Sequence, residues 1–115
     1  MDKIYEQTML FDFYGELLTE HQRSIYEDAV YNDMSLGEIA NERGISRQGV
    51  HDLIRRCDKI LQDYERKLHL VERFTRAKET VAEIEKLTDT DVGSKDMEER
   101  LRRIKVLSHE LLDEL

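Results

Sequence analysis

The strongest constraint on the fold of this chain is a pair of helix-start signals separated by a glycine. Ser35 is followed three residues later by Glu38, the spacing of a capping box that joins the serine hydroxyl and the carboxylate to backbone amides. Gly44 suits the left-handed backbone that ends a helix, and Ser46 is placed to cap the next helix. Ile45 is expected to be buried in the turn. The pattern predicts a short helix, a tight turn and a longer helix, which together make a helix-turn-helix over residues 35–56.

Apolar residues recur at helical spacing on both sides of this turn. They are Leu36, Ile39 and Ala40 before it, and Val50, Leu53, Ile54 and Cys57 after it. Ala40 is small enough to let two crossing helices approach closely, and Val50 is placed to pack between them. The spacing therefore predicts that the two helices bury one face each against the same core.

The opposite, polar face of the second helix carries the candidate functional residues. A recognition helix presents such side chains to base edges and phosphates in a major groove of DNA. We therefore identify six candidate DNA-contacting residues, which are Ser46, Arg47, Gln48, His51, Asp52 and Arg55.

Two further helices are expected before the motif. Asp2 is placed to cap a helix over residues 2–14, and Gly15 is its expected end. Thr19 and Gln22 have the spacing of a second capping box, with Leu18 as a hydrophobic staple.

The second helix of the motif is predicted to continue to Leu68, because apolar residues keep helical spacing that far. The spacing resumes over 71–87 and again over 97–115, with a polar break at 88–95 and Asp96 as a candidate cap. We therefore divide the chain into a helix-turn-helix domain (1–68) and a helical hairpin (69–115) for packing or oligomerisation. The segment over 71–87 carries the spacing of a seam for a partner helix, formed by Val71, Phe74, Ala77, Val81, Ile84 and Leu87. The residues of the last helix expected to face inward are Met97, Leu101, Ile104, Leu107, Leu111 and Leu115.

Composition agrees with an all-α fold of amphipathic helices. The 115 residues include no proline, and 38% of them are charged. The net charge of −8 is unevenly distributed, because residues 1–34 carry −6, residues 35–68 carry +1 and residues 69–115 carry −3. The motif is thus the least acidic part of the chain, although it lacks the dense basic charge typical of DNA-binding domains.

No catalytic or metal-binding pattern is present in the sequence. The four histidines are far apart and lack metal-ligand spacing, and there is no glycine-rich phosphate loop or nucleophile motif. Cys57 lies on an apolar face and is expected to be a buried, inert thiol. We expect a protein without enzymatic activity, cofactor or membrane insertion, located in the cytoplasm.

The run LLTEHQRSIYEDAVYNDMSLGEIANERGISRQGVHDLIRRCDKIL resembles region 4 of bacterial sigma factors. The matching residues are Leu18-Thr19, Gln22-Arg23, Glu38-Ile39-Ala40, Gly44, Ser46-Arg47, Val50 and Ile54. The chain as a whole, with its aromatic-rich start and acidic helical tail, is similar to the YlxM/p13-like family of small bacterial helix-turn-helix proteins.

This resemblance implies a cytoplasmic, all-α protein with a sigma region 4-like core, no winged helix and long C-terminal helices that favour a homodimer or higher homo-oligomer. The genes of that family lie beside the gene of the signal-recognition-particle GTPase, which implies an accessory or regulatory role in that pathway. The contact positions carried over from sigma region 4 are Arg47, Gln48, His51, Asp52 and Arg55. Asp52 departs from the expected chemistry, because a carboxylate would face phosphates or base edges.

Two functions stay open at this point. One is a DNA-binding regulator that acts through the candidate residues. The other is an accessory protein that does not bind DNA, but binds the signal-recognition-particle GTPase or its RNA. The acidic first third of the chain would suit a basic partner protein.

Overall fold

The computed structural model describes residues 2–89 and 97–115, and every regular element in these ranges is helical. The predicted all-α fold class is therefore confirmed. The α-helices are α1 (Lys3–Tyr14), α2 (Glu20–Val30), α3 (Leu36–Arg43), α4 (Arg47–Leu68), α5 (Leu70–Leu87) and α6 (Met97–Glu114), and a 3-10 turn, η1 (Gly15–Leu17), follows α1. Asp96 and most of the expected polar break lie outside the described residues.

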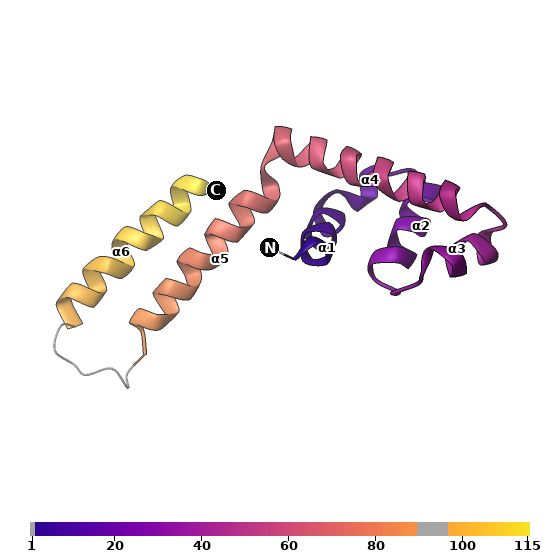
Figure 1. Cartoon of the computed structure of the whole chain (residues 1–115). Helices are drawn as coiled ribbons and strands as arrows, with labels where there is room; N and C mark the ends of the chain where they lie inside the picture. Colours follow the sequence, from indigo (N-terminus) through magenta and orange to yellow (C-terminus); the bar gives the residue numbers. More distant parts are fainter. Residues whose placement is uncertain (1, 90–96) are drawn as a thin grey trace. The chain divides into compact units, whose positions relative to one another are not determined.

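The chain forms two compact units, an N-terminal unit (Met1–Val71) and a C-terminal unit (Glu72–Leu115). In the N-terminal unit, α4 contacts α1, α2 and α3, and Figure 1 shows it lying across these shorter helices. The long second helix of the motif thus organises the whole N-terminal unit.

The predicted helix starts and the predicted helix end are confirmed. Thr19 and Ser35 each form a complete capping box, and the Ser46 hydroxyl accepts a hydrogen bond from the Gly49 amide at 2.9 Å. Asp2 caps α1 through a hydrogen bond from the Ile4 amide. Gly44 ends α3 with a φ of 68°, in the left-handed region.

The expected burial of Ile45 is wrong, because 37% of this residue is exposed. The Gly44 turn directs the Ile45 amide back to the carbonyl oxygen of Ala40, at 3.1 Å, which closes the end of α3. The core beneath the turn is filled by Ile39, Ala40 and Val50 instead.

Two apolar clusters form the core of the N-terminal unit. One joins α2, α3 and α4, and the other joins α1, the residue that follows η1, α2 and α4. Their buried members are Ile25, Ile39, Ala40 and Val50 in the first cluster, and Leu10, Tyr14, Leu18, Tyr26, Cys57 and Leu61 in the second. Leu53 and Ile54 pack against both clusters, so α4 connects them into one core.

Cys57 is fully buried in this core, as expected of an inert thiol. Burial, followed by the neighbouring charge of Asp58, raises the pKa of the thiol to about 11. The thiolate needed for reactivity is therefore scarce at neutral pH.

Two carboxylates of α4 turn inward and connect this helix to others. Asp58 accepts hydrogen bonds from Gln7 at 3.0 Å and from the Tyr26 hydroxyl at 2.5 Å. Glu65 accepts from the Tyr14 hydroxyl at 2.6 Å and from the Val71 amide at 3.0 Å. Burial, and then the hydrogen bond to Asp58, raises the pKa of Tyr26. Both carboxylates therefore form their hydrogen bonds with other groups of the N-terminal unit.

The C-terminal unit is a hairpin of α5 and α6. Ion pairs join Arg76 to Glu114 at 3.0 Å and Arg103 to Glu83 at 3.2 Å, an antiparallel register. The predicted inward positions are correct for Leu107, which is buried. They are wrong for Met97, Leu101 and Leu115, which are exposed. Phe74 and Val81 of the predicted α5 seam are also exposed. Two helices alone cannot cover seams of this length.

None of the helices within the described ranges is long and apolar enough to span a membrane.

Candidate nucleic-acid interface

The N-terminal end of α4 stands at the surface of the N-terminal unit. The Ser46 cap fixes the first turn, and a Cβ at Gly49 would lie 3.0 Å from the Ser46 hydroxyl oxygen. Glycine at this position therefore avoids a close contact with the Ser46 hydroxyl, which can then cap the helix. Since buried Val50 points into the core, the polar residues around it are turned to solvent.

The six candidate residues lie together along this end of the helix. His51 is half-buried, and the other five, which are Ser46, Arg47, Gln48, Asp52 and Arg55, are exposed. They are reachable by a ligand that approaches α4 from outside.

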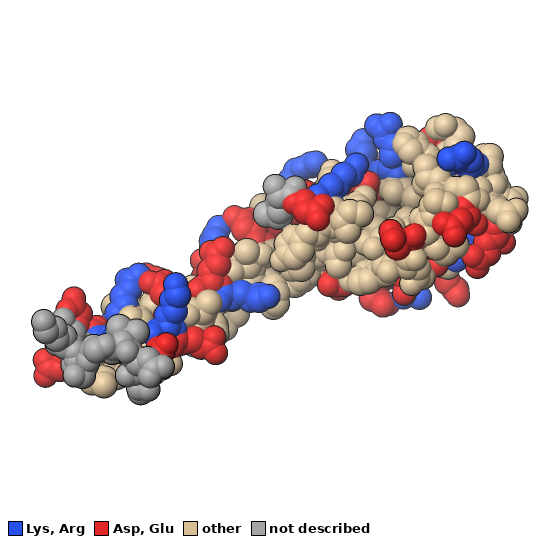
Figure 2. All heavy atoms as spheres, turned by 60° about the horizontal axis from the view of Figure 1, so that its bottom comes forward, with Lys and Arg blue, Asp and Glu red and all other residues tan. Residues whose placement is uncertain are grey.

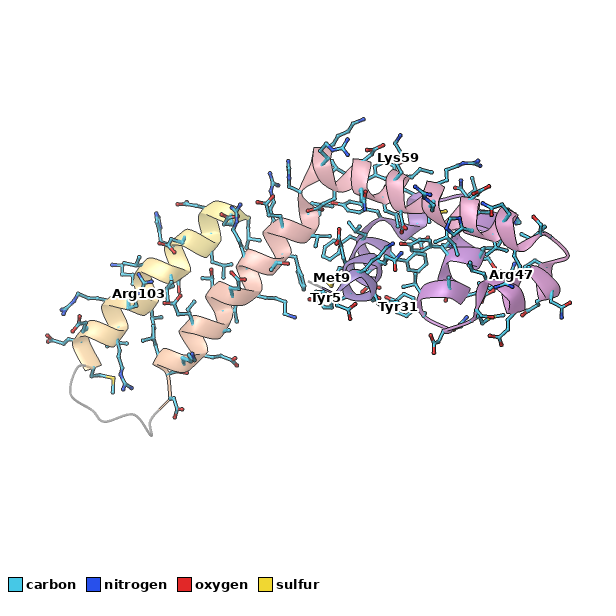
Figure 3. All side chains as sticks on the ribbon, viewed as in Figure 1. Tyr5, Met9, Tyr31, Arg47, Lys59 and Arg103 are labelled. Atoms are coloured by element: carbon cyan, nitrogen blue, oxygen red, sulfur yellow. The ribbon has the colours of Figure 1, made fainter. Side chains whose placement is uncertain are left out.

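Arg47 bridges the two helices of the motif. A Cβ built on Gly37 would lie 3.8 Å from the Arg47 Nε atom, so the guanidinium lies against the first turn of α3 (Figure 3). The guanidinium thus lies beside the helix start at Ser35 and near its own helix start at Ser46. Helix starts carry partial positive charge, which strengthens the attraction of this corner for phosphate.

Asp52 is engaged by its neighbours on α4. Its Oδ1 atom accepts a hydrogen bond from Nε2 of the Gln48 side chain at 2.9 Å. His51 Nδ1 lies 3.7 Å from the same oxygen, beyond hydrogen-bond distance, and has no other partner among the described residues. One of the two Gln48 Nε2 hydrogens is therefore engaged by Asp52, and the Nδ1 atom of His51 is an unused donor or acceptor.

The structure adds basic residues that the sequence interpretation missed. Arg56, directly after Arg55, and Lys59, one turn beyond Arg55, are exposed on α4, and Figure 3 shows Lys59 on the outer side of this helix. Each lies four residues after a candidate residue, Arg56 after Asp52 and Lys59 after Arg55, so continuing the candidate stripe along the helix could have identified them.

The outer face of α4 is basic although the whole chain is acidic. This helix contains six Lys and Arg residues, all exposed, and four acidic residues. Two of those acids, Asp58 and Glu65, are the carboxylates that turn inward. Figure 2 shows Lys and Arg along the upper edge of the N-terminal unit and Asp and Glu along its lower edge. In the folded N-terminal unit, basic and acidic side chains thus lie on different sides, which the net charge of a sequence segment does not reveal.

Arg43, by contrast, is not part of this surface. Its guanidinium donates hydrogen bonds to Ser24 at 2.6 Å and to Asp28 at 2.7 Å, which holds α3 against α2. The hydrogen bond from Arg43 also lowers the pKa of Asp28. The role of this arginine is therefore structural.

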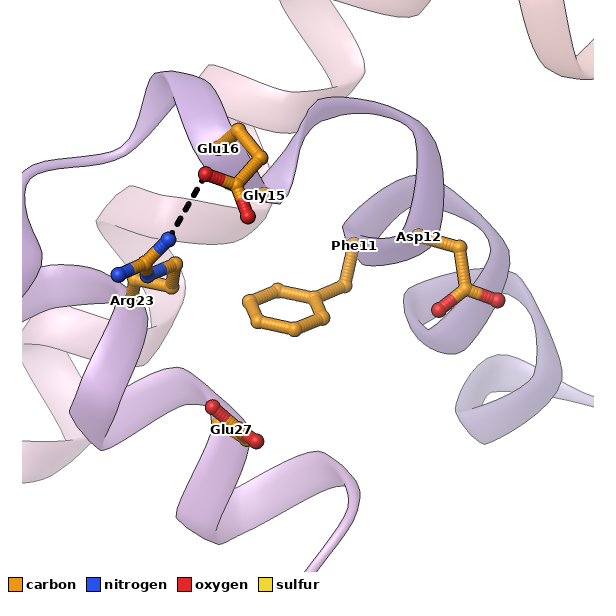
Figure 4. A pocket seen from close by; sticks show the side chains of 6 residues that line it. All are labelled: Phe11, Asp12, Gly15, Glu16, Arg23 and Glu27. Atoms are coloured by element: carbon orange, nitrogen blue, oxygen red, sulfur yellow. Dashed lines mark hydrogen bonds and ion pairs between the residues drawn. The ribbon is translucent and has the colours of Figure 1, made fainter.

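A second, acidic feature lies between α1 and α2. A pocket of about 300 Å³ is lined by Phe11, Asp12, Gly15, Glu16, Arg23 and Glu27 (Figure 4). Arg23 pairs with Glu16 at 2.9 Å, and the Tyr31 hydroxyl donates to Asp12. Three carboxylates and one guanidinium thus surround an aromatic ring. This combination favours a cationic group over an anionic one.

Comparison with known proteins agrees with this geometry. A family model described as "Putative helix-turn-helix protein, YlxM / p13 like" matches residues 1–104. A UPF0122 protein of Shouchella clausii is 41% identical over 107 residues, which cover 93% of this chain and 98% of the relative. A UPF0122 protein of Acetivibrio thermocellus is 42% identical over 116 residues, covering 98% of this chain and 99% of the relative. Because these matches span nearly the full length of both partners, the chain belongs to the YlxM/p13-like family of helix-turn-helix proteins.

Proposed function

We propose that this chain is a DNA-binding regulatory protein that reads duplex DNA with the N-terminal half of α4. The observation that carries the proposal is the exposed row of Arg47, Gln48 and Arg55 on a helix-turn-helix whose outer face is basic. A helix in this position enters the major groove with its first turns against the base edges. The protein would act in the cytoplasm, without a catalytic activity of its own.

The candidate residues divide into two chemical roles under this proposal. Arg47 and Gln48 stand at the start of α4, where arginine pairs with guanine and glutamine with adenine through two hydrogen bonds each. Arg55, Arg56 and Lys59 lie further along the helix and are suited to phosphate oxygens, which hold the protein in register. Asp52 would release Gln48 on binding and accept from a cytosine amino group.

The test is selection from a random duplex library with the purified protein at low salt. We expect an enriched motif, and we expect Arg47→Ala to weaken binding to that motif by about 10- to 100-fold, the value of one two-bond base contact. Arg102→Ala is the matched control, because Arg102 is exposed on α6. If no motif is enriched, or if both variants bind equally well, DNA reading by α4 is excluded.

A second candidate function is an accessory role in which the acidic pocket of α1 and α2 binds a basic protein partner. The specific support is the ring of carboxylates around Phe11. The resemblance described above points to the signal-recognition-particle GTPase, with or without its RNA. We expect Glu27→Gln to weaken a salt-sensitive association with the purified GTPase and Arg47→Ala to leave that association unchanged. The reverse pattern would exclude the pocket.

We further propose that the chain acts as a homo-oligomer. A two-fold dimer would present two α4 helices to successive major grooves.

A further inference from the structure

The α5–α6 hairpin has too little core for its length. Among the described residues of the C-terminal unit, only Leu107 is fully buried, and no α5 side chain in Leu70–Leu87 is. Helices of this length draw most of their stability from packing of an apolar face. The hairpin therefore leaves much of its apolar surface in contact with water.

On one flank of the hairpin, ion pairs join the two helices. The two ion pairs between the helices join Arg76 to Glu114 and Glu83 to Arg103. On α6, Arg103 and Glu114 lie on one side of the buried Leu107, since successive residues are about 100° apart around the axis. On α5, Arg76 and Glu83 lie about 80–100° from the half-buried Ile84, also on one side.

The other flank of α6 is apolar and exposed. Its residues lie about 80–140° from Leu107, away from the ion pairs. They are Met97, Leu101, Ser108, Leu112 and Leu115, and the four apolar ones are between 57% and 89% exposed. With Ile104 they repeat at intervals of three and four, the spacing of a helix-packing seam.

The corresponding flank of α5 faces the same way. Val81, 45% exposed, lies about 60° from Ile84 on the side opposite Arg76 and Glu83. Since the ion pairs bring the charged flanks of the two antiparallel helices together, the apolar flanks also lie on one common side. The hairpin thus has one flank closed by ion pairs and a second flank that is apolar on α6. On α5, Val81 shares this second flank with the exposed Lys78 and Glu85, which lie about 100–120° from Ile84. We call this second flank the apolar flank.

The apolar pattern of α6 is symmetric about Ser108. Leu101 and Leu115 lie seven residues before and after it, and Ile104 and Leu112 lie four residues before and after it. Two antiparallel copies of α6 that cross at Ser108 would therefore place Leu101 of one against Leu115 of the other, and Ile104 against Leu112. This is the self-complementarity that a two-fold interface requires, and the small serine allows a close approach at the axis.

We propose that the apolar flank of the hairpin pairs with the same flank of a second copy of this chain, so that α5 and α6 of both copies form a four-helix bundle. Bundles of this kind bury such seams at shallow crossing angles. The inference rests on the oligomeric part of the proposed function and is independent of whether DNA is bound.

The test is the mass of the full-length chain in solution, measured by sedimentation at micromolar concentrations. We expect a species with twice the 13.7 kDa of the chain. Leu112→Lys should weaken association by about 100-fold or more, because the interface would bury an unpaired ammonium group. Val106→Lys is the matched control, since Val106 is also exposed on α6 but lies about 120° round the helix.

A monomeric wild type, or a Leu112→Lys variant that associates like the Val106→Lys control, would overturn the proposal. A second measurement covers the case in which Leu112→Lys fails to fold. Ser108→Cys should form a disulfide between copies under mild oxidation, and Val106→Cys should not, while Cys57 stays buried. Cross-linking through Val106→Cys alone would place the contact elsewhere.

The two proposals fail separately. A monomer that still selects a DNA motif would refute the four-helix bundle and support DNA reading. A stable dimer that selects no motif would support the bundle and refute DNA reading.

Discussion

At the scale of single residues, the turn between α3 and α4 depends on the backbone of Gly44. Its φ of 68° is one that side-chain-bearing residues adopt at a cost. A Cβ at this position would meet nothing within 4 Å, so the requirement for glycine is conformational and not steric. Gly37 differs, since its backbone is helical and a Cβ there would make only ordinary contacts.

We therefore predict opposite effects of alanine at these two glycines. Gly44→Ala should lower the free energy of unfolding by about 1–2 kcal/mol, the cost of a left-handed alanine. Gly37→Ala should raise it by up to about 1 kcal/mol, because alanine restricts the unfolded chain and favours helix. Urea unfolding followed by circular dichroism measures both. Equal effects of the two changes would contradict the conformational explanation.

At the scale of elements, the packing of α2 against α3 has a charged component as well as an apolar one. Arg43 near the end of α3 reaches Ser24 and Asp28 of α2. The Asp28 side chain is only 13% exposed, so this ion pair is shielded from solvent more than most surface pairs are. The clamp holds the first helix of the motif in place beneath α4.

This clamp predicts a pH-dependent stability. Because the hydrogen bond from Arg43 lowers the pKa of Asp28 in the folded state, the ionised carboxylate stabilises the fold above its unfolded pKa of about 3.9. That contribution is lost as the pH falls through the folded pKa. Asp28→Asn should cost about 1–3 kcal/mol at neutral pH, and the difference from wild type should shrink in acid.

Thermal unfolding at a series of pH values measures this difference. Glu42→Gln on the exposed face of α3 is the control, and it should leave the stability at neutral pH nearly unchanged. An Asp28→Asn deficit that stays constant down to the acid range would exclude the ion pair as its origin.

At the scale of the whole molecule, the two units differ in how they are stabilised. The N-terminal unit has two joined apolar clusters and inward hydrogen bonds at Asp58 and Glu65. The α4 helix ends with the His69 amide donating to the Glu65 carbonyl oxygen at 2.8 Å. The Tyr14 hydroxyl accepts from the Leu70 amide at the start of α5, at 3.1 Å and within the same unit. The hairpin has a single fully buried side chain among its described residues.

We predict that a fragment of residues 1–71 folds by itself, because it retains both apolar clusters and the hydrogen bonds at the junction of α4 and α5. It should unfold cooperatively and keep Cys57 unreactive toward a thiol reagent until denaturant is added. A fragment of residues 72–115 should be helical only at concentrations where it self-associates. Gradual unfolding of the first fragment, or rapid labelling of its thiol, would contradict this division.

Local sequence was sufficient for the helix starts and for the turn. Capping by Thr19, Ser35 and Ser46 is decided within three residues, and the left-handed Gly44 within one, so these features could be predicted without tertiary contacts. The apolar periodicity likewise predicted the buried face of α4 through Val50 and Cys57. The candidate stripe follows from that face, since residues opposite a buried one are turned to solvent.

Tertiary structure alone decided which polar groups stay at the surface and which apolar groups are covered. Asp58 and Glu65 look like solvated acids in the sequence, but partners on other elements draw them inward and leave the outer face of α4 basic. Ile45, Leu101 and Leu115 look like core residues, but they remain exposed in the folded chain. Helix periodicity determines a direction around one axis. Whether a residue on that side of the helix is buried depends on other helices that are distant in sequence and pack against it, and these contacts have no local sequence signal.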